Sequence, residues 1–388
     1  MKLLKITAEG LPLFKEKLDL TFYAQQRVNE DDKEVLYPLF SNIYLNPANG
    51  FIGINASGKT SVLKVILVIL NMLNNEPLNH IEGIDILGDA KTVVFNSFFY
   101  AEENQEIGRL ETVVISKKTV TNDRQYSIIS EKLWLKKAAE TITRKEIVNF
   151  TGKTPVIIRN EQEEFLSEDV SIMIAYNKKI KEHINVANLL LFTNINVFPF
   201  PLDISPEVIT FLDPTIEKLS IKKKNEKSLT YLKFKNKKEI VLDNPIELSS
   251  YLSSGTIKGM IVFTLAKMLL QTGGYLIVDE LENHFNKEIA ATLMRFFMDS
   301  KLNKNGAVLL FSTHYPELLD EYERNDSIFI TRNQDGIFVE NLCHILNRND
   351  MKKSDVYQSG FLKGTTPIYE AYMELKKAMA VIGSIYRY

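Results

Sequence analysis

The segment from Gly53 to Thr60 constrains this chain more than any other, because its sequence GINASGKT fits the pattern G-x-x-x-x-G-K-[ST] at every fixed position. Small residues are required where successive backbone N–H groups curl around phosphate oxygens, and Gly53, Ala56, Ser57 and Gly58 provide them. An apolar run precedes the loop and a longer one follows it, which predicts a buried strand, the loop and then a buried helix. The sequence therefore predicts a nucleotide site.

Each position of this loop has an expected role. Lys59 reaches the β- and γ-phosphates, the Thr60 hydroxyl holds Mg²⁺, and Ser61 opens a helix whose N-terminal dipole favours negative charge. We expect ATP and Mg²⁺ to be bound by Gly53, Asn55, Ala56, Ser57, Gly58, Lys59, Thr60 and Ser61.

Two later apolar runs end in residues that suit phosphate chemistry. The first, Tyr275–Val278, leads directly into Asp279 and Glu280, which is a Walker B arrangement. Asp279 is expected to support the Mg²⁺ shell, and Glu280 to polarise the attacking water. The second run, Ala307–Thr313, ends at His314, which we expect to sense the γ-phosphate because ligands gather at the carboxyl ends of parallel strands.

A turn of hydroxyl residues and glycine, Ser253-Ser254-Gly255, precedes an apolar run that predicts a helix over Met260–Leu270. Alone it is an ordinary helix cap. Its position 24 residues before Asp279 makes it a candidate second phosphate contact.

The composition excludes several classes of protein. The single Cys343 rules out a disulfide framework, and no run of eighteen uncharged apolar residues or signal peptide is present, so we expect a cytoplasmic protein with no membrane role. The net charge of −2 divides unevenly, with +7 over residues 117–238 and eight lysines within Lys222–Lys238. This basic middle suits a solvated face or a nucleic-acid contact.

The remaining pattern predicts the other elements of the fold. Alternating residues predict strands over Lys2–Ile6, Leu18–Phe22, Thr92–Ser130 and Ile216–Leu242. Helical spacing is expected over Glu131–Lys145, Ile172–Leu191 and Ile368–Ile382. Gln105 is a candidate for a γ-phosphate or Mg²⁺ sensor, and one of Tyr23, Tyr37, Phe40 and Tyr44 is a candidate to stack on adenine, with core packing as the alternative role for each.

The order GINASGKT, LSSGT, YLIVDE and STH resembles the ABC-type ATPase superfamily, in particular its soluble branch with the RecF, Rad50 and SMC heads. The phrases around the loop, the turn and His314 most resemble anti-phage ATPases of the overcoming-lysogenization-defect, Septu, PARIS and AbiL types. The resemblance implies an α/β fold: an ABC-type P-loop head with an antiparallel β subdomain and an inserted helical lobe. The expected parts are an N-terminal ATPase lobe (1–130), a helical insertion (131–215), a C-terminal ATPase lobe (216–345) and a helical tail (346–388).

The resemblance also implies a mechanism. Two copies pack head to tail, with Ser254 and Gly255 of one facing the γ-phosphate held by Lys59 of the other, in a homodimer or higher homo-oligomer. Ser253 is counted with them among the nucleotide-binding residues. The departures from the family pattern are the LSSGT turn, a sensor glutamine that the sequence does not identify, and 74 residues after His314, too few for a Toprim nuclease lobe. The 194 residues from Lys59 to Ser253 are also too few for a long coiled-coil arm.

Three functions fit these observations. The first is an ATPase that regulates an effector, a toxin or nuclease encoded nearby, in anti-phage defence. The second is a RecF-like repair or recombination ATPase that binds duplex DNA through Lys222–Lys238. The third is a transporter nucleotide-binding subunit, which the LSSGT turn and the large insertion disfavour.

Overall fold

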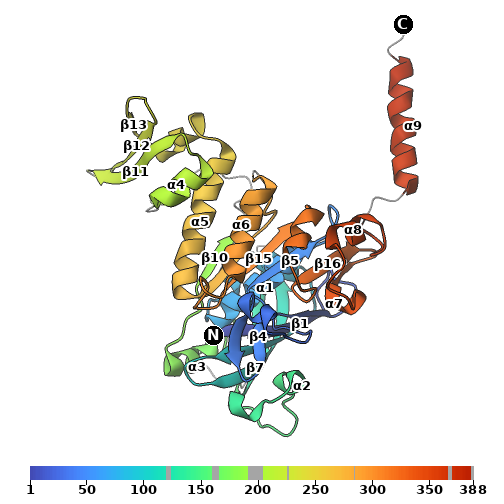
Figure 1. The fold of residues 1–388 in the computed structure, drawn as a ribbon. Coiled ribbons are helices and arrows are strands. Elements are labelled where there is room, and N and C mark those ends of the chain that lie inside the picture. The colour runs from blue at the N-terminus through green and yellow to red at the C-terminus, as the bar shows by residue number, and fades with distance from the viewer. Residues whose placement is uncertain are drawn as a thin grey trace.

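The computed structural model describes residues 1–118, 124–159, 166–190, 204–224, 227–283, 285–365 and 369–385. Within these ranges the chain forms two six-stranded sheets, one three-stranded sheet and one small pair of strands. Helices pack on both faces of one large sheet, so the α/β class that the sequence predicts is confirmed (Figure 1).

The first large sheet is parallel except for its last strand. In spatial order its strands are β10 (Val186–Leu189), β14 (Gly274–Val278), β15 (Ala307–Thr313), β5 (Ala48–Ile52), β16 (Ile328–Asn333) and the antiparallel β17 (Ile337–Asn341). The strands β14, β15 and β5 are direct neighbours. Their carboxyl ends, which carry the three predicted motifs, therefore lie side by side.

The second large sheet is antiparallel throughout. Its order is β2 (Leu18–Thr21), β1 (Lys2–Glu9), β6 (Val93–Ala101), β7 (Glu106–Lys118), β8 (Arg124–Lys137) and β9 (Ile157–Ile158). The strands expected near the start of the chain and over Thr92–Ser130 are thus present. A separate antiparallel pair, β3 (Tyr37–Phe40) and β4 (Ile43–Leu45), lies between β2 and β6 in the sequence.

Two hydrophobic cores share the parallel sheet. Alternate residues of its strands point to opposite faces, so Ile277 joins one core and Val278 the other. The first core contains α1 (Lys59–Leu73), which is apolar on nearly all sides and therefore buried between the two large sheets. The second core contains α5 (Ser254–Thr272) and α6 (Lys287–Met298).

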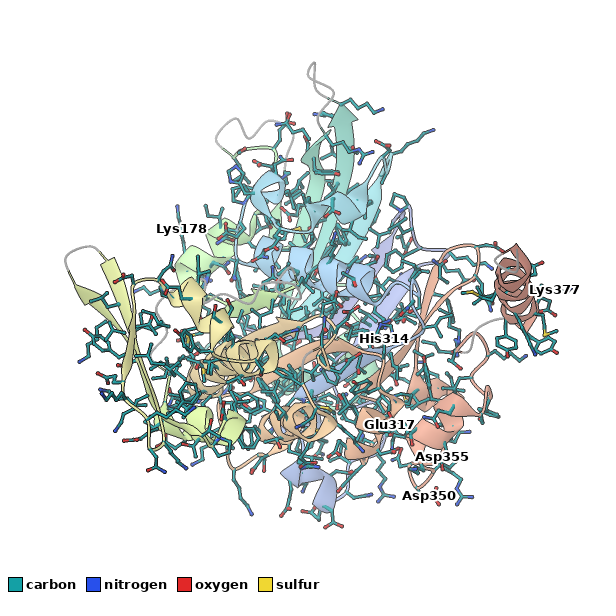
Figure 2. The ribbon with its side chains drawn as sticks, turned by 90° about the horizontal axis from the view of Figure 1, so that it is seen from above. Lys178, His314, Glu317, Asp350, Asp355 and Lys377 are labelled. Carbon is teal, nitrogen blue, oxygen red and sulfur yellow. The ribbon has the colours of Figure 1, made fainter. Side chains whose placement is uncertain are left out.

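Two parts of the chain extend from this body. One is a three-stranded sheet of β11 (Ile216–Lys224), β12 (Lys227–Phe234) and β13 (Ile240–Leu242), which we call the β-arm; it lies near α4 (Pro206–Leu212) and one end of α5 (Figure 1). The other is α9 (Tyr369–Ile385), which carries Lys377 away from the body (Figure 2). The short helices are α2 (Arg144–Ile147), α3 (Met173–Ile180), α7 (Leu342–Ile345) and α8 (Lys353–Gln358).

Two helix predictions are wrong in part. Residues 131–137 continue β8, because they pair along β7, with Glu131 opposite Thr112, and pairing between distant segments overrides the helix propensity of a Glu/Lys-rich stretch. The second helix stops at Ile180 in α3, and Val186–Leu189 forms β10, which pairs with β14. Both errors share one cause, which is that local spacing carries no information about a partner strand elsewhere in the chain.

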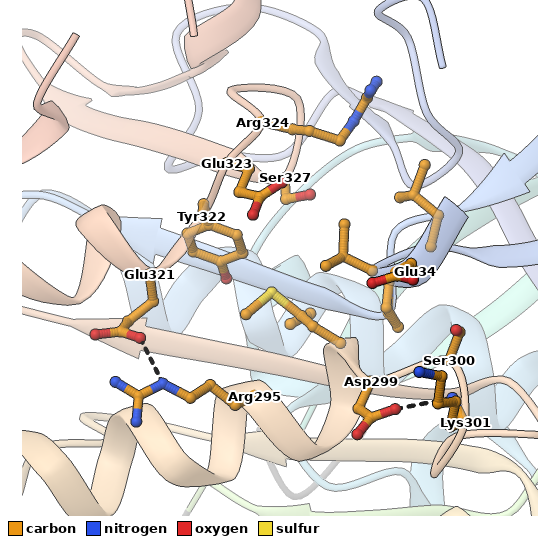
Figure 3. Close-up of a pocket in the computed structure, with 15 residues that line it drawn as sticks. Glu34, Arg295, Asp299, Ser300, Lys301, Glu321, Tyr322, Glu323, Arg324 and Ser327 are labelled. Carbon is orange, nitrogen blue, oxygen red and sulfur yellow. Dashed lines mark hydrogen bonds and ion pairs between the residues drawn. The ribbon is translucent and has the colours of Figure 1, made fainter. Parts of the chain in front are cut away.

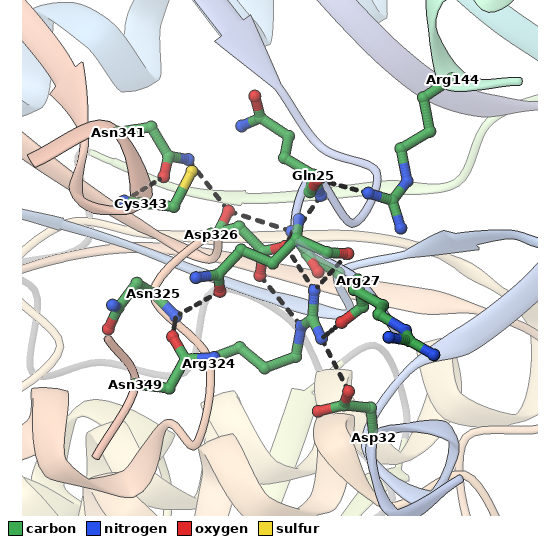
Figure 4. A network of polar contacts seen from close by, with 12 residues as sticks. Gln25, Arg27, Asp32, Arg144, Arg324, Asn325, Asp326, Asn341, Cys343 and Asn349 are labelled. Carbon is green, nitrogen blue, oxygen red and sulfur yellow. Dashed lines mark hydrogen bonds and ion pairs between the residues drawn. The ribbon is translucent and has the colours of Figure 1, made fainter. Parts of the chain in front are cut away.

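A buried ionic network joins the loop after β2 to the segment before β16 (Figure 4). The Arg324 guanidinium contacts Asp326 at 2.6 Å and Asp32 at 3.0 Å, and it donates to the backbone carbonyls of Gln26 and Arg27. Asp326 in turn accepts two backbone N–H groups, from residues 25 and 26. The cation and its carboxylates satisfy one another, so the network fixes two segments about 300 residues apart.

We expect Arg324→Met to lower the free energy of unfolding by ~3–5 kcal/mol, because it leaves two buried carboxylates without their cation. Urea denaturation followed by circular dichroism measures this. The matched control is Arg348→Met, whose ion pair with Asp350 is exposed and whose loss should leave the curve unchanged. Equal shifts for both variants would contradict a structural role for the network.

Candidate functional site

The predicted phosphate loop lies between β5 and α1, as the sequence indicates. Its backbone has the left-handed turns that such a loop needs, with φ of 60° at Ala56 and 98° at Gly58. A Cβ at Gly53 would come within 2.4 Å of Thr331 atoms, and one at Gly58 within 2.6 Å of Ile337. Both glycines are therefore fixed by close packing against β16 and β17.

Two side chains of β16 form hydrogen bonds to the phosphate loop. The Ser57 and Thr331 hydroxyls are 2.8 Å apart, and the Asn333 amide donates to the Ala56 carbonyl at 3.0 Å. These contacts fix the conformation of the loop at Ala56 and Ser57. No sequence pattern indicates them, because β16 lies some 270 residues away from the loop.

Lys59 lies at the start of α1 with its Nζ inside the curve of the loop. Nζ donates to the Gly53 carbonyl at 2.9 Å and lies 3.4 Å from His314 Nδ1. Burial lowers the pKa of Lys59, and the negative charges of Asp279, Glu282 and Glu280 oppose that shift. The cation thus lies in a largely buried position surrounded by acceptors.

Asp279, directly after β14, is hydrogen-bonded to the start of α1 and to β15. The Thr60 hydroxyl donates to its Oδ2 at 2.7 Å, and the Ser312 hydroxyl of β15 donates to its Oδ1. Ser312 Oγ also accepts the Glu280 backbone N–H at 2.7 Å. The predicted metal pair, Thr60 and Asp279, is therefore brought together in the structure.

Glu280 and His314 face each other at the ends of β14 and β15. Glu280 has φ of 48°, a left-handed conformation that is uncommon for a residue with a side chain. His314 Nε2 lies 3.8 Å from Glu280 Oε1, and Asn283 donates to Glu280 Oε2 at 3.3 Å. The His314 backbone N–H donates to Glu282 at 2.5 Å. The two predicted catalytic residues thus share one partly exposed edge.

The residues Ser253, Ser254 and Gly255 are not brought to this edge within the chain. They form the N-terminus of α5, where the Ser253 hydroxyl caps the helix by accepting the Thr256 N–H at 3.0 Å. Ser253 is exposed and Ser254 and Gly255 are half-buried, so this end faces solvent in part.

A cavity of about 760 Å³ opens over the phosphate loop. Besides loop residues, Glu280 and His314, it is lined by six residues that the sequence did not single out: Pro12, Leu13, Asn333, Asp335, Gly336 and Ile337. None of the four aromatic residues considered for adenine lines it: Tyr23 is buried in a separate core and Phe40 packs on Tyr100. The apolar wall beside the loop is instead Pro12, Leu13 and Ile337.

The prediction that Gln105 senses the nucleotide is wrong. Gln105 lies in the turn between β6 and β7, and it does not line the cavity. This turn follows the end of β6, where Tyr100 pairs with Lys2 of β1. Lys2 Nζ donates to Gly306, just before β15, which is the opposite end of the parallel sheet from His314.

A second cavity, of about 400 Å³, lies elsewhere, at the start of β5 (Figure 3). It is lined by Pro47, Ala48 and Tyr322 with a mixture of charged groups, among them Arg295, which is paired with Glu321 at 2.8 Å. It contains none of the motif residues. We therefore take the first cavity, which lies above the phosphate loop, as the candidate nucleotide site.

The residues at the loop fit a triphosphate and Mg²⁺. The tight left-handed turns at Ala56 and Gly58 present backbone N–H groups, and Thr60 and Asp279 place two hard oxygen ligands together. Among the described residues, no group of three or more His, Cys, Asp and Glu could hold a metal by itself. Two protein oxygens suit Mg²⁺, which completes its octahedron with water and phosphate oxygens.

Comparison with known proteins gives one family. The family model described as "AAA domain, putative AbiEii toxin, Type IV TA system" matches residues 48–320, a range that contains every motif residue discussed above. No curated protein matches the chain. In the described part of the chain, no helix is both long and apolar enough to cross a bilayer.

We expect Gly58→Ala to weaken ATP binding by about tenfold or more, because the added methyl group would collide with Ile337 and distort the loop. Fluorescence titration with a labelled ATP measures the affinity. Gly152→Ala is the matched control: Gly152 also has positive φ, at 76°, but nothing lies within 4 Å of its Cβ position. Unchanged affinity in Gly58→Ala would contradict the placement of the nucleotide.

Proposed function

This chain belongs to the AAA-domain family whose description includes the AbiEii toxin, a family of P-loop ATPases, and from that premise we propose that it hydrolyses ATP at a site shared between two copies and thereby regulates a partner effector in anti-phage defence. The observation that carries the proposal is the convergence of Thr60, Asp279 and Ser312 at adjacent strand ends. The ABC-type assignment within this family is part of the proposal.

The chain's own residues divide the work. Backbone N–H groups of the loop and the Lys59 ammonium bind and orient the phosphates, and Thr60 and Asp279 would hold Mg²⁺, which neutralises charge on the β- and γ-phosphates when bound. Glu280 lies beside His314 at the open edge of the site, where it can take a proton from an attacking water. The His314 imidazole can donate a hydrogen bond to an oxygen of the γ-phosphate.

The second copy completes the site. Within one chain the N-terminus of α5 does not line the cavity, yet it offers Ser254, Gly255 and helix-terminal N–H groups at a partly exposed position. A head-to-tail dimer places this end against the γ-phosphate held by the other copy. ATP then favours the closed dimer by mass action, and hydrolysis reopens it.

The link to defence comes from the family description, which names a toxin and a type IV toxin–antitoxin system. An ATPase whose closed and open states alternate can bias the activity of a toxin or nuclease partner. We therefore infer that the output of this chain is a change in its assembly rather than work on a transported substrate.

We expect Glu280→Gln to lower ATP turnover by about 100-fold or more while ATP affinity stays within about twofold, because the amide cannot accept the proton but leaves the loop intact. With ATP and Mg²⁺ the variant should elute as a stable dimer in size-exclusion chromatography with light scattering. A monomer under those conditions would exclude the shared site.

The matched variant adds Ser254→Arg to Glu280→Gln. Ser254 does not line the chain's own cavity, and an arginine at this half-buried position at the start of α5 would obstruct the approach of a second copy. It should abolish the ATP-dependent dimer and leave nucleotide binding by each chain intact.

A second candidate function, binding to duplex DNA, rests on the β-arm. Four of its described lysines contact an acidic or aromatic side chain: Lys218 and Lys233 pair with Glu239 and Glu217, whereas Lys222 and Lys237 lie over the rings of Tyr231 and Phe234. Cations next to aromatic rings suit phosphate and base contacts. A RecF-like role in repair or recombination would use this surface.

If the β-arm binds DNA, the logarithm of affinity should fall linearly with the logarithm of salt concentration. Lys222→Glu with Lys237→Glu should weaken binding and reduce the slope by roughly two, one for each phosphate that is no longer neutralised. Fluorescence anisotropy with a duplex oligonucleotide measures both, and Lys377→Glu with Lys376→Glu on α9 is the control. Equal effects of the two pairs, or no binding at low salt, would remove this candidate.

A further inference from the structure

Lys258 is a buried cation that lacks a direct hydrogen-bonding partner in the described part of the chain. It lies on α5 with 1% of its surface exposed, and its Nζ is unpaired among the residues that the structure describes. Lysine is almost never buried without a pairing group, since the charge loses its hydration. The side chain therefore costs stability where it lies.

The surroundings of Lys258 are the carboxylates of the proposed catalytic edge. Burial lowers its pKa, and the charges of Glu280, Glu282 and Asp279, in that order, act against this. The Phe285 ring lies 5.9 Å from Nζ. Glu282 also has a buried polar atom without a hydrogen-bond partner among the described residues, its Oε2. Its other oxygen, Oε1, accepts the His314 N–H.

The place of Lys258 on α5 connects two parts of the mechanism. Ser254 and Lys258 are four residues apart, so they lie on the same side of the helix, one turn from each other. One end of this turn would face the nucleotide of the second copy, and the other carries Lys258, which lies beside Phe285 and within the electrostatic influence of the chain's own Glu280. A helix turn is stiff, so a movement at Ser254 moves Lys258.

We propose that Lys258 is a positioning residue that couples the phosphate contact at the start of α5 to the carboxylates of Glu280 and Glu282 in the same chain. Each α5 then links the two nucleotide sites of the dimer: engagement at one site sets the catalytic edge of the other. This inference rests on the proposed shared site and deepens it by naming the group that carries the coupling.

The test compares Lys258→Met with Lys267→Met. Methionine keeps most of the length of the side chain and removes its charge, and Lys267 is an exposed lysine on the same helix. For Lys258→Met we expect kcat to fall by about tenfold or more, the affinity of each chain for labelled ATP to stay within about twofold, and Tm to stay equal or rise. Lys267→Met should match the wild type in all three.

Lys258→Arg, which restores the charge, should recover more of kcat than Lys258→Met. A merely structural lysine gives a different result, because its loss lowers Tm and kcat together. That result, or a kcat for Lys258→Met within twofold of the wild type, would overturn the inference. If the wild type itself turns over no ATP, the proposed function fails first, so the two failures are distinguishable.

Discussion

The structure depends on one carboxylate, that of Asp279. Its two oxygens accept hydrogen bonds from Thr60, at the start of α1, and from Ser312, near the end of β15. Three chain segments, the first of them far from the other two in sequence, are thereby held at one sheet edge. Since the Ser312 hydroxyl also accepts the Glu280 N–H, the same contact fixes the left-handed turn at Glu280 and with it the direction of the proposed base.

The two cores on either side of the parallel sheet give this edge different surroundings. On one side α1 lies buried between two sheets, so the phosphate loop begins from a rigid support. On the other side α5 and α6 form a second core, and α5 begins at a partly exposed turn. The rigid side suits binding of the triphosphate. The side of α5 suits a response to a second copy, and Lys258 is the group that would bring that response to Glu280.

Sequence patterns predicted the local parts of this arrangement well. The phosphate loop, the strand before Asp279 and the strand before His314 each consist of contiguous residues whose spacing carries the signal. What the sequence could not supply were contacts between distant segments: Thr331 and Asn333 under the loop, Leu13 and Ile337 beside it, and the pairing that makes strands of residues 131–137 and 186–189. Lys258, in the first turns of the apolar helix after Ser254, likewise carried no indication in the sequence that it would be buried near acidic residues.

Binding of ATP by the purified wild-type chain, measured by isothermal titration calorimetry with and without Mg²⁺, tests the central claim most directly. If the ends of β5, β14 and β15 form a nucleotide site, we expect one ATP per chain and an affinity that weakens when Mg²⁺ is removed, since Asp279 and Thr60 act through the metal. No heat of binding, or an affinity indifferent to Mg²⁺, would contradict the account.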